Sequence, residues 1–75
     1  MKVKVHHPDG SVIADTSDFA AAALLMSLYG DNSLITYRGK TLWQEGKDGI
    51  GADSYDTTSM TIEQKLIDMG VRLDG

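Results

Sequence analysis

The stretch "ADTSDFAAAALLMSLYG", residues 14–30, predicts a helix and shows where that helix starts. A hydroxyl from Thr16 or Ser17 can cap the first turn, because its oxygen accepts a backbone N–H that has no partner within the helix. Asp18 would then lie in the first turn, where a negative charge suits the positive end of the helix dipole. These polar residues therefore indicate a helix N-terminus directly before a long apolar run.

The apolar run that follows has the composition of a buried helix. Alanine, leucine and methionine dominate it, and all three favour helix. Gly30 suits the end of the helix, because glycine adopts a positive φ without a Cβ clash. We therefore predict a helix over residues 17–29. A sheet can cover one side of it, but Leu24, Leu25 and Leu28 cannot all lie on that side, so the remaining apolar surface would meet the second helix, a second copy or a partner.

A near copy of the start of this stretch occurs later in the chain. The pentad "ADTSD" at 14–18 is echoed by "ADSYD" at 52–56. In both places short polar side chains can cap a helix, and acids can interact favourably with its dipole. The echo therefore predicts a second helix start, and capping explains it without a shared binding motif.

The last element has the periodicity of an amphipathic helix. From Ile62 onward, apolar residues recur at intervals of four and three, which places them on one face of a helix. The tetrad "TIEQ" offers a capping box that begins at Thr61. A start near Thr57 or Ser59 also fits the sequence.

Each predicted helix is preceded by a β-hairpin. In the first, "KVKVH" alternates as a half-buried strand does, "HPDG" supplies turn residues and "SVIA" returns, so a hairpin is expected over residues 2–14. In the second, "SLITYRGKTLWQEG" has strand-forming residues on both sides of the turn "RGK". This pattern predicts strands over residues 34–38 and 41–45.

The expected fold class is α+β. Two β-β-α units form a ββαββα pseudo-repeat, which predicts a two-layer sandwich with a four-stranded, mainly antiparallel sheet and two helices on one face. The repeat is compatible with duplication and with convergence on good capping chemistry. The residues expected in the core are Val3, Val5, Val12, Phe19, Ala22, Ala23, Met26, Leu34 or Ile35, Leu42, Ile62, Leu66 and Met69.

Length and composition limit what the chain can be. Its 75 residues are expected to form a single domain, residues 1–75, with a small core. It has no cysteine, so neither disulfides nor a thiolate metal site stabilise it. Its longest apolar run is shorter than the roughly 20 residues that span a bilayer, and its N-terminus lacks the apolar core of a signal peptide. A cytoplasmic location is therefore expected.

The formal charge of −4 is unevenly distributed along the chain. Residues 5–37 contain aspartates and neither lysine nor arginine, whereas Arg38, Lys40 and Lys47 make the middle locally basic. These scattered cations do not provide the basic stripe that direct nucleic-acid binding requires. An anionic membrane surface is disfavoured for the same reason.

No motif with catalytic or metal-binding spacing stands out. His6 and His7 are adjacent, so on a strand they would point to opposite faces and could not easily hold one metal. The loop "DGIGADSYD", residues 48–56, has neither the spacing of an EF-hand calcium loop nor the lysine of a P-loop. We therefore expect no enzymatic activity, no catalytic residue, no metal site and no cofactor.

The candidates for a binding surface are an aromatic residue and the acids. Trp43 either packs across the strands or, if it is exposed, contacts a protein partner. The acids would form a negative patch if the two helices lay side by side, or would simply be a solvated surface that maintains solubility. The partner-binding candidates are Asp15, Asp18, Asp31, Asp53, Asp56, Glu63, Asp68 and Trp43.

In size, acidity, lack of cysteine and compact α/β pattern, the whole chain resembles small proteins of phages and mobile elements, such as the anti-CRISPR proteins. The resemblance rests on these general features, so no functional residue is carried over from that group. It implies a non-enzymatic inhibitor whose negatively charged surface mimics nucleic acid and blocks the nucleic-acid-binding groove of a host defence complex. The expected partner is thus a basic protein complex, with no direct binding to nucleic acid or membrane.

An alternative hypothesis gives the chain a structural or regulatory role. The apolar helix over 17–29 and Trp43 would then mediate dimerisation or docking to a protein. The inhibitor hypothesis predicts a monomer in preference to a dimer.

Overall fold

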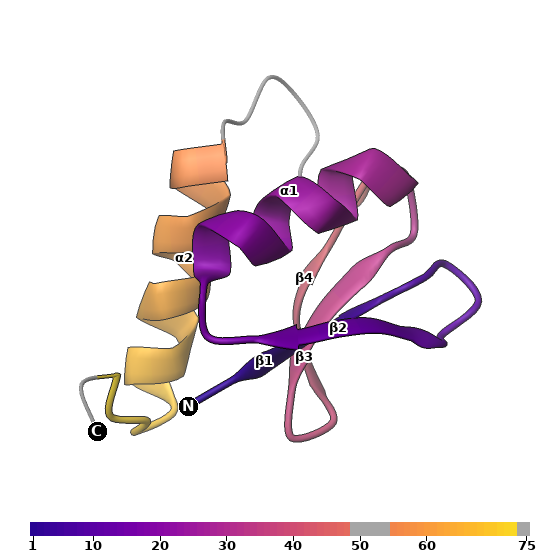
Figure 1. The fold of residues 1–75 in the computed structure, drawn as a ribbon. Helices are drawn as coiled ribbons and strands as arrows, with labels where there is room; N and C mark the ends of the chain where they lie inside the picture. Colours follow the sequence, from indigo (N-terminus) through magenta and orange to yellow (C-terminus); the bar gives the residue numbers. More distant parts are fainter. Residues whose placement is uncertain (49–54, 74–75) are drawn as a thin grey trace.

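The computed structural model describes residues 1–48 and 55–73 (Figure 1). Its element order is ββαββα, as predicted. The elements are β1 (Val3–His6), β2 (Val12–Thr16), α1 (Phe19–Tyr29), β3 (Leu34–Tyr37), β4 (Lys40–Gln44) and α2 (Tyr55–Asp68). The α+β class expected from the sequence is confirmed.

The strands form a four-stranded sheet in the order β2-β1-β3-β4, and every neighbouring pair is antiparallel. β1 pairs with both β2 and β3, so it joins the first hairpin to the second. At its middle, Val5 lies opposite Ala14 on one side and Ile35 on the other. β2 and β3 therefore run parallel on either side of β1, and α1 connects them by crossing over β1.

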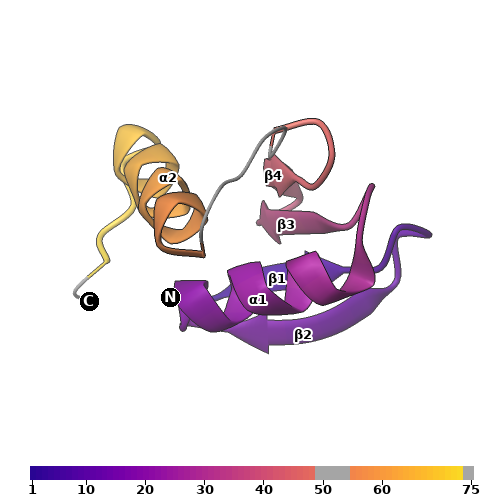
Figure 2. The same ribbon diagram turned by 90° about the horizontal axis from the view of Figure 1, so that it is seen from above.

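Both helices pack on the same side of the sheet, as predicted. α1 contacts β1, β2 and β3, whereas α2 contacts β4 and α1 (Figures 1 and 2). Seen from above, α1 lies lengthwise while α2 is nearly end-on, so the helices cross steeply (Figure 2). One core cluster joins Val3 and Ile35 of the sheet with Met26 of α1 and Leu66 of α2. Within the described residues, neither helix has the length and apolarity to cross a bilayer.

Most residues predicted for the core are buried: Val3, Val5, Ala22, Ala23, Met26, Ile35, Leu42, Ile62 and Leu66. Phe19 packs against them while remaining partly exposed. The prediction is wrong for Val12 and Met69. Val12 is 53% exposed because it lies opposite His6, on the side of the sheet that faces away from the helices. Met69 is 38% exposed and lies directly after α2, which ends at Asp68.

A β-bulge brings two adjacent residues of β4 into the core. Ile35 lies opposite Trp43, but the next residue of β3, Thr36, lies opposite Thr41. Leu42 is thus the extra residue. Successive residues of a regular strand point to opposite faces, and this irregularity allows both Leu42 and Trp43 to be buried.

The start of α1 differs from the predicted one. The N-cap is Asp18 instead of Thr16 or Ser17, and its carboxylate accepts a hydrogen bond from the backbone N–H of Ala21 at 3.0 Å. The Thr16 hydroxyl accepts the backbone N–H of Asp18 at 3.0 Å. A carboxylate at the cap combines an acceptor with a charge that suits the helix dipole, which explains why Asp18 takes this position.

α2 begins at Tyr55, before the capping box predicted at Thr61. The Thr61 hydroxyl donates to the backbone carbonyl of Thr57 at 3.0 Å, which is a typical bond for a threonine inside a helix. The predicted start at Thr61 is therefore wrong. The pentad at 52–56 overlaps the beginning of α2, but residues 52–54 lie outside the described part of the chain.

Candidate functional site

The predicted acidic residues occupy several elements. Asp53 and the side chain of Asp56 lie outside the described part of the structure. Because the helices cross steeply, the start of α1 lies beside the middle of α2 and not beside its start. The other candidates are Asp15 on β2, Asp18 before α1, Asp31 after α1, and Glu63 and Asp68 on α2.

Two of these acids share one hollow although they belong to different helices. Asp18 at the start of α1 and Glu63 in the middle of α2 line a hollow of about 350 Å³ together with Ala20 and Ser59. Both carboxylates are exposed to solvent. We call this feature, which Met1 also lines, the acidic hollow because it carries two carboxylates.

Asp15 and Asp68 lie among cations instead. Asp15 is opposite Lys4 in the pairing of β1 with β2, and both line a second hollow. Asp68 lines a third hollow together with Lys40 and Lys65. Nearby positive charges offset these two carboxylates, so neither extends the acidic hollow.

A further group of acids lies near the opposite end of α1. Asp31 follows α1 and lies against Gly46, where an added Cβ would be 2.9 Å from an oxygen of the Asp31 carboxylate. Glu45 precedes Gly46, and the Asp48 carboxylate accepts the backbone N–H of Gln44 at 2.8 Å. Glu45 and Asp48 could not be singled out from the sequence because they adjoin its locally basic stretch.

Trp43 does not belong to an exposed surface. Its side chain is 5% exposed, and its Nε1–H has no hydrogen-bond partner among the described residues. Cross-strand packing is therefore the correct interpretation of this tryptophan. Its predicted role as a partner contact is wrong, because Trp43 lies opposite Ile35, whose side chain is buried in the core.

α1 presents an apolar face to solvent. Leu28 is 71% exposed, and Leu24, one turn earlier, is 41% exposed. Both lie on the side of α1 away from Ala22 and Met26, which are buried. We call the side that carries Leu24 and Leu28 the outer face of α1. The contact between α1 and α2 leaves it uncovered by the described part of the chain.

Tyr29 lies at the end of α1 next to this face, whereas Met60 and Ile67 form a separate apolar surface on α2. At the end of α1, the Tyr29 ring meets the His7 ring edge-to-face with 4.6 Å between centroids, which ties α1 to the first hairpin turn. Met60 and Ile67 are also exposed. They lie two turns apart on one side of α2 and were not singled out from the sequence.

The histidines hold the first hairpin in place. His6 donates through Nδ1 to the backbone carbonyl of Gly10 at 3.0 Å, and its Nε2 lies 2.8 Å from the hydroxyl oxygen of Thr36. These bonds fix the turn and connect β1 to β3. In the part of the chain that the structure describes, no three metal-ligating side chains come together.

Comparison with known proteins gives no further guide to function. No protein-family model matches the chain, and no match was found among curated proteins or solved structures. Function must therefore be inferred from the exposure, charge and packing of individual residues.

Proposed function

We propose that the protein is a non-enzymatic binding protein that docks on a protein partner through the outer face of α1. The observation that carries this proposal is the exposure of Leu28 and Leu24 on a helix whose other side forms the core. Fully burying an exposed leucine contributes roughly 1.5–3 kcal/mol. A partner that covers this face would therefore gain affinity from apolar contact alone.

The contacts of the histidines support binding over catalysis. A catalytic histidine needs a reacting group or a carboxylate partner within hydrogen-bond reach. Here His6 binds Gly10 and Thr36, and His7 packs on Tyr29. These contacts stabilise the first hairpin, so they support a structural role for both histidines.

The test compares two substitutions of equal chemistry. Leu28→Glu places a charge on the outer face of α1, and Met60→Glu places the same charge on α2 at a residue that is 68% exposed. The partner captured by the wild-type protein from a cell lysate should be lost with Leu28→Glu and retained with Met60→Glu. Equal retention by both variants would contradict the proposal.

A more specific form of this proposal is an inhibitor of the anti-CRISPR kind that acts in the cytoplasm. The net charge of −4 and the pairing of Asp18 with Glu63 in the acidic hollow support it. The hollow includes Ala20, and Leu24 lies one turn further along the same side of α1. An acidic end next to an apolar face would suit a basic nucleic-acid-binding groove, where it would exclude the nucleic acid.

Charge substitutions test this specific form separately. Asp18→Asn keeps a side-chain oxygen at the N-cap while it removes the charge, and Glu63→Gln removes the second charge of the acidic hollow. The double variant should bind a basic partner complex more weakly and with less dependence on salt, whereas Asp31→Asn at the other end of α1 should bind as the wild type does. Binding that is indifferent to salt and to the double variant would leave the apolar docking proposal standing and remove the inhibitor form.

The same apolar face also suits a second copy of the chain, because a two-fold axis can bring one patch against itself. The exposure of both leucines supports this structural alternative. Light scattering distinguishes the two cases. A monomer that still binds its partner supports docking, and a dimer that Leu28→Glu dissociates supports self-association.

A further inference from the structure

The cations of this acidic protein gather at one end of the molecule. Six of its seven lysine and arginine residues line three hollows. The hollows adjoin because they share Tyr37, Arg38, Lys40 or Met69. The six cations are Lys2, Lys4, Arg38, Lys40, Lys65 and Arg72. Lys47 lies beyond the other end of β4.

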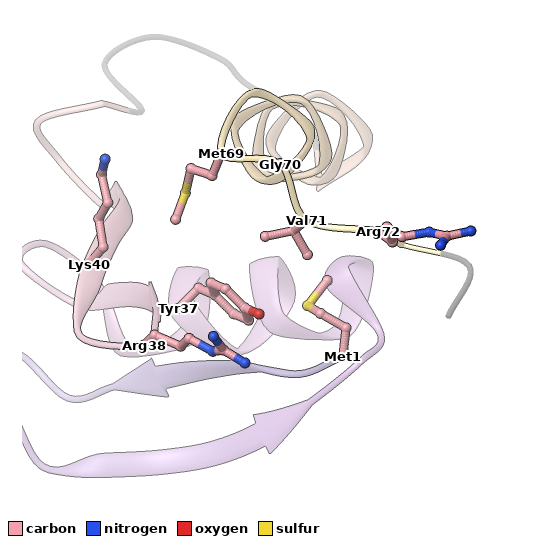
Figure 3. Close-up of a pocket in the computed structure, with 8 residues that line it drawn as sticks. All are labelled: Met1, Tyr37, Arg38, Lys40, Met69, Gly70, Val71 and Arg72. Atoms are coloured by element: carbon pink, nitrogen blue, oxygen red, sulfur yellow. The ribbon is translucent and has the colours of Figure 1, made fainter.

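The largest of these three hollows has an apolar floor and a cationic rim. It measures about 660 Å³ and lies between the β3–β4 turn and the segment after α2. The side chains of Met1, Met69 and Val71 point into the same space beside the Tyr37 ring (Figure 3). Arg38 lies at its edge beside the Tyr37 ring, whereas Lys40 and Arg72 line it with side chains that extend outward (Figure 3). We call this feature the basic groove.

Arg38 is held at the rim against local backbone preference. Its φ is 50° and that of Gly39 is 80°, so both central residues of this two-residue turn have a positive φ. Asparagine, aspartate and glycine are the residues that such turns favour. The Arg38 guanidinium lies over the Tyr37 ring, with its carbon 5.4 Å from the ring centroid. Arg38 is exposed, so its guanidinium is available to an anionic ligand at the rim.

We propose that the basic groove binds a short acidic peptide segment with one apolar side chain. The apolar side chain would lie on the floor between Met69 and Val71, since flexible thioethers adapt to such groups. Flanking carboxylates would pair with the rim, where an arginine presents a fork that matches a carboxylate. The groove volume falls within the usual range for ligand sites.

The composition of the groove favours a peptide over single-stranded nucleic acid. Bases bind on successive exposed aromatic rings, but Tyr37 is half-buried and the rest of the floor is aliphatic or thioether. A long polyanion would also meet the net charge of −4. None of the described lining residues belongs to α1, so this proposal is independent of docking through the outer face of α1.

Fluorescence anisotropy tests the proposal with a dye-labelled peptide in which a central leucine is flanked by aspartates. The controls are the same peptide with asparagines and a thymidine oligonucleotide. We expect the acidic peptide to bind, and Arg38→Asn and Arg72→Gln each to weaken that binding about fivefold. Lys47→Gln makes the same charge change outside the groove and should leave the affinity unchanged.

Arg38→Asn is compatible with the turn, so a loss of binding in this variant would not reflect misfolding. Circular dichroism of each variant confirms this point. The proposal would be overturned if the acidic peptide failed to bind or bound no better than the asparagine peptide. It would equally be overturned by a similar effect of Lys47→Gln, or by tighter binding of the oligonucleotide.

Discussion

Arg38 and Gly39 form the turn between β3 and β4, and both have a positive φ. The letters "RGK" predict a turn with glycine at a positive φ, and the structure confirms both. The positive φ of Arg38 could not be predicted, because it follows from the turn having two central residues and not from any preference of arginine. The sequence predicts Tyr37 as a strand residue, but its contact with the Arg38 guanidinium could not be predicted.

Arg38→Asn should stabilise the fold. Asparagine adopts a positive φ more readily than arginine, so the free energy of unfolding should rise by about 0.5–1 kcal/mol. Urea denaturation followed by circular dichroism measures the change. Lys40→Asn, which lies in β4, is the control and should gain nothing. A lower stability for Arg38→Asn would show that its contact with Tyr37 outweighs the backbone strain.

Asp9 gives the first hairpin turn a dependence on pH. Its carboxylate accepts bonds from the Ser11 hydroxyl at 2.7 Å and from the Ser11 backbone N–H at 2.8 Å, and these bonds lower the pKa of Asp9 below 3.8. When the pKa of a carboxyl is lower in the folded state than in the unfolded state, the carboxyl stabilises the fold at pH values above its unfolded pKa. This contribution is lost as the pH falls through the folded-state pKa. Acidification from 3.8 downward should therefore loosen the turn.

The substitution Ser11→Ala isolates the side-chain part of this effect. It removes the hydroxyl bond, which is the largest cause of the shift, so the pKa of Asp9 should move upward towards 3.8. An NMR titration of the Asp9 carboxyl measures it directly. An unchanged pKa would show that the backbone bond alone accounts for the shift.

At the scale of elements, the sequence predicts the bounds of α1 more closely than those of α2. The long apolar run and Gly30 predict α1 to within a few residues, with Asp18 as the cap in place of its neighbours. α2 begins at Tyr55, within the second pentad and near the alternative start at Thr57, whereas the capping box predicted at Thr61 lies inside the helix. The bulge in β4 and the register shift where β2 pairs with Val5 and His6 of β1 could not be predicted, since both follow from how the strands pair.

Substitutions on the two sides of α1 should have opposite consequences. Met26 is buried in the core cluster, so Met26→Ala should lower the free energy of unfolding by about 2–3 kcal/mol. Leu28→Ala on the outer face should change it by less than about 0.5 kcal/mol, because the side chain is exposed. Chemical denaturation of both variants measures the difference. Comparable losses would mean that the outer face of α1 is packed within the molecule.

At the scale of the whole molecule, strand order gathers cations that lie far apart in the linear sequence. The pairing of β1 with β3 places Lys4 opposite Thr36, and the β3–β4 turn then brings Arg38 and Lys40 to the same end. Lysines near the N-terminus thus join cations from the middle of the chain. The element order could be predicted, but the strand order and therefore the basic groove could not.

The arrangement of the helices also decides which of the described acids lie together. The helices cross steeply (Figure 2), and Asp18 and Glu63 line one hollow. The outer face of α1 depends on no such pairing, because a helix that is apolar all round must expose one side on a small sheet. Docking through this face therefore does not depend on how the acids are arranged.

Photo-crosslinking in cells tests whether a partner docks on the outer face of α1. A photoreactive amino acid in place of Leu28 reports on the outer face of α1, and the same residue in place of Met60 reports on the exposed side of α2. We predict a covalent adduct with a protein partner from position 28 and none from position 60. Adducts from position 60 alone, or from neither position, would contradict docking through the outer face of α1.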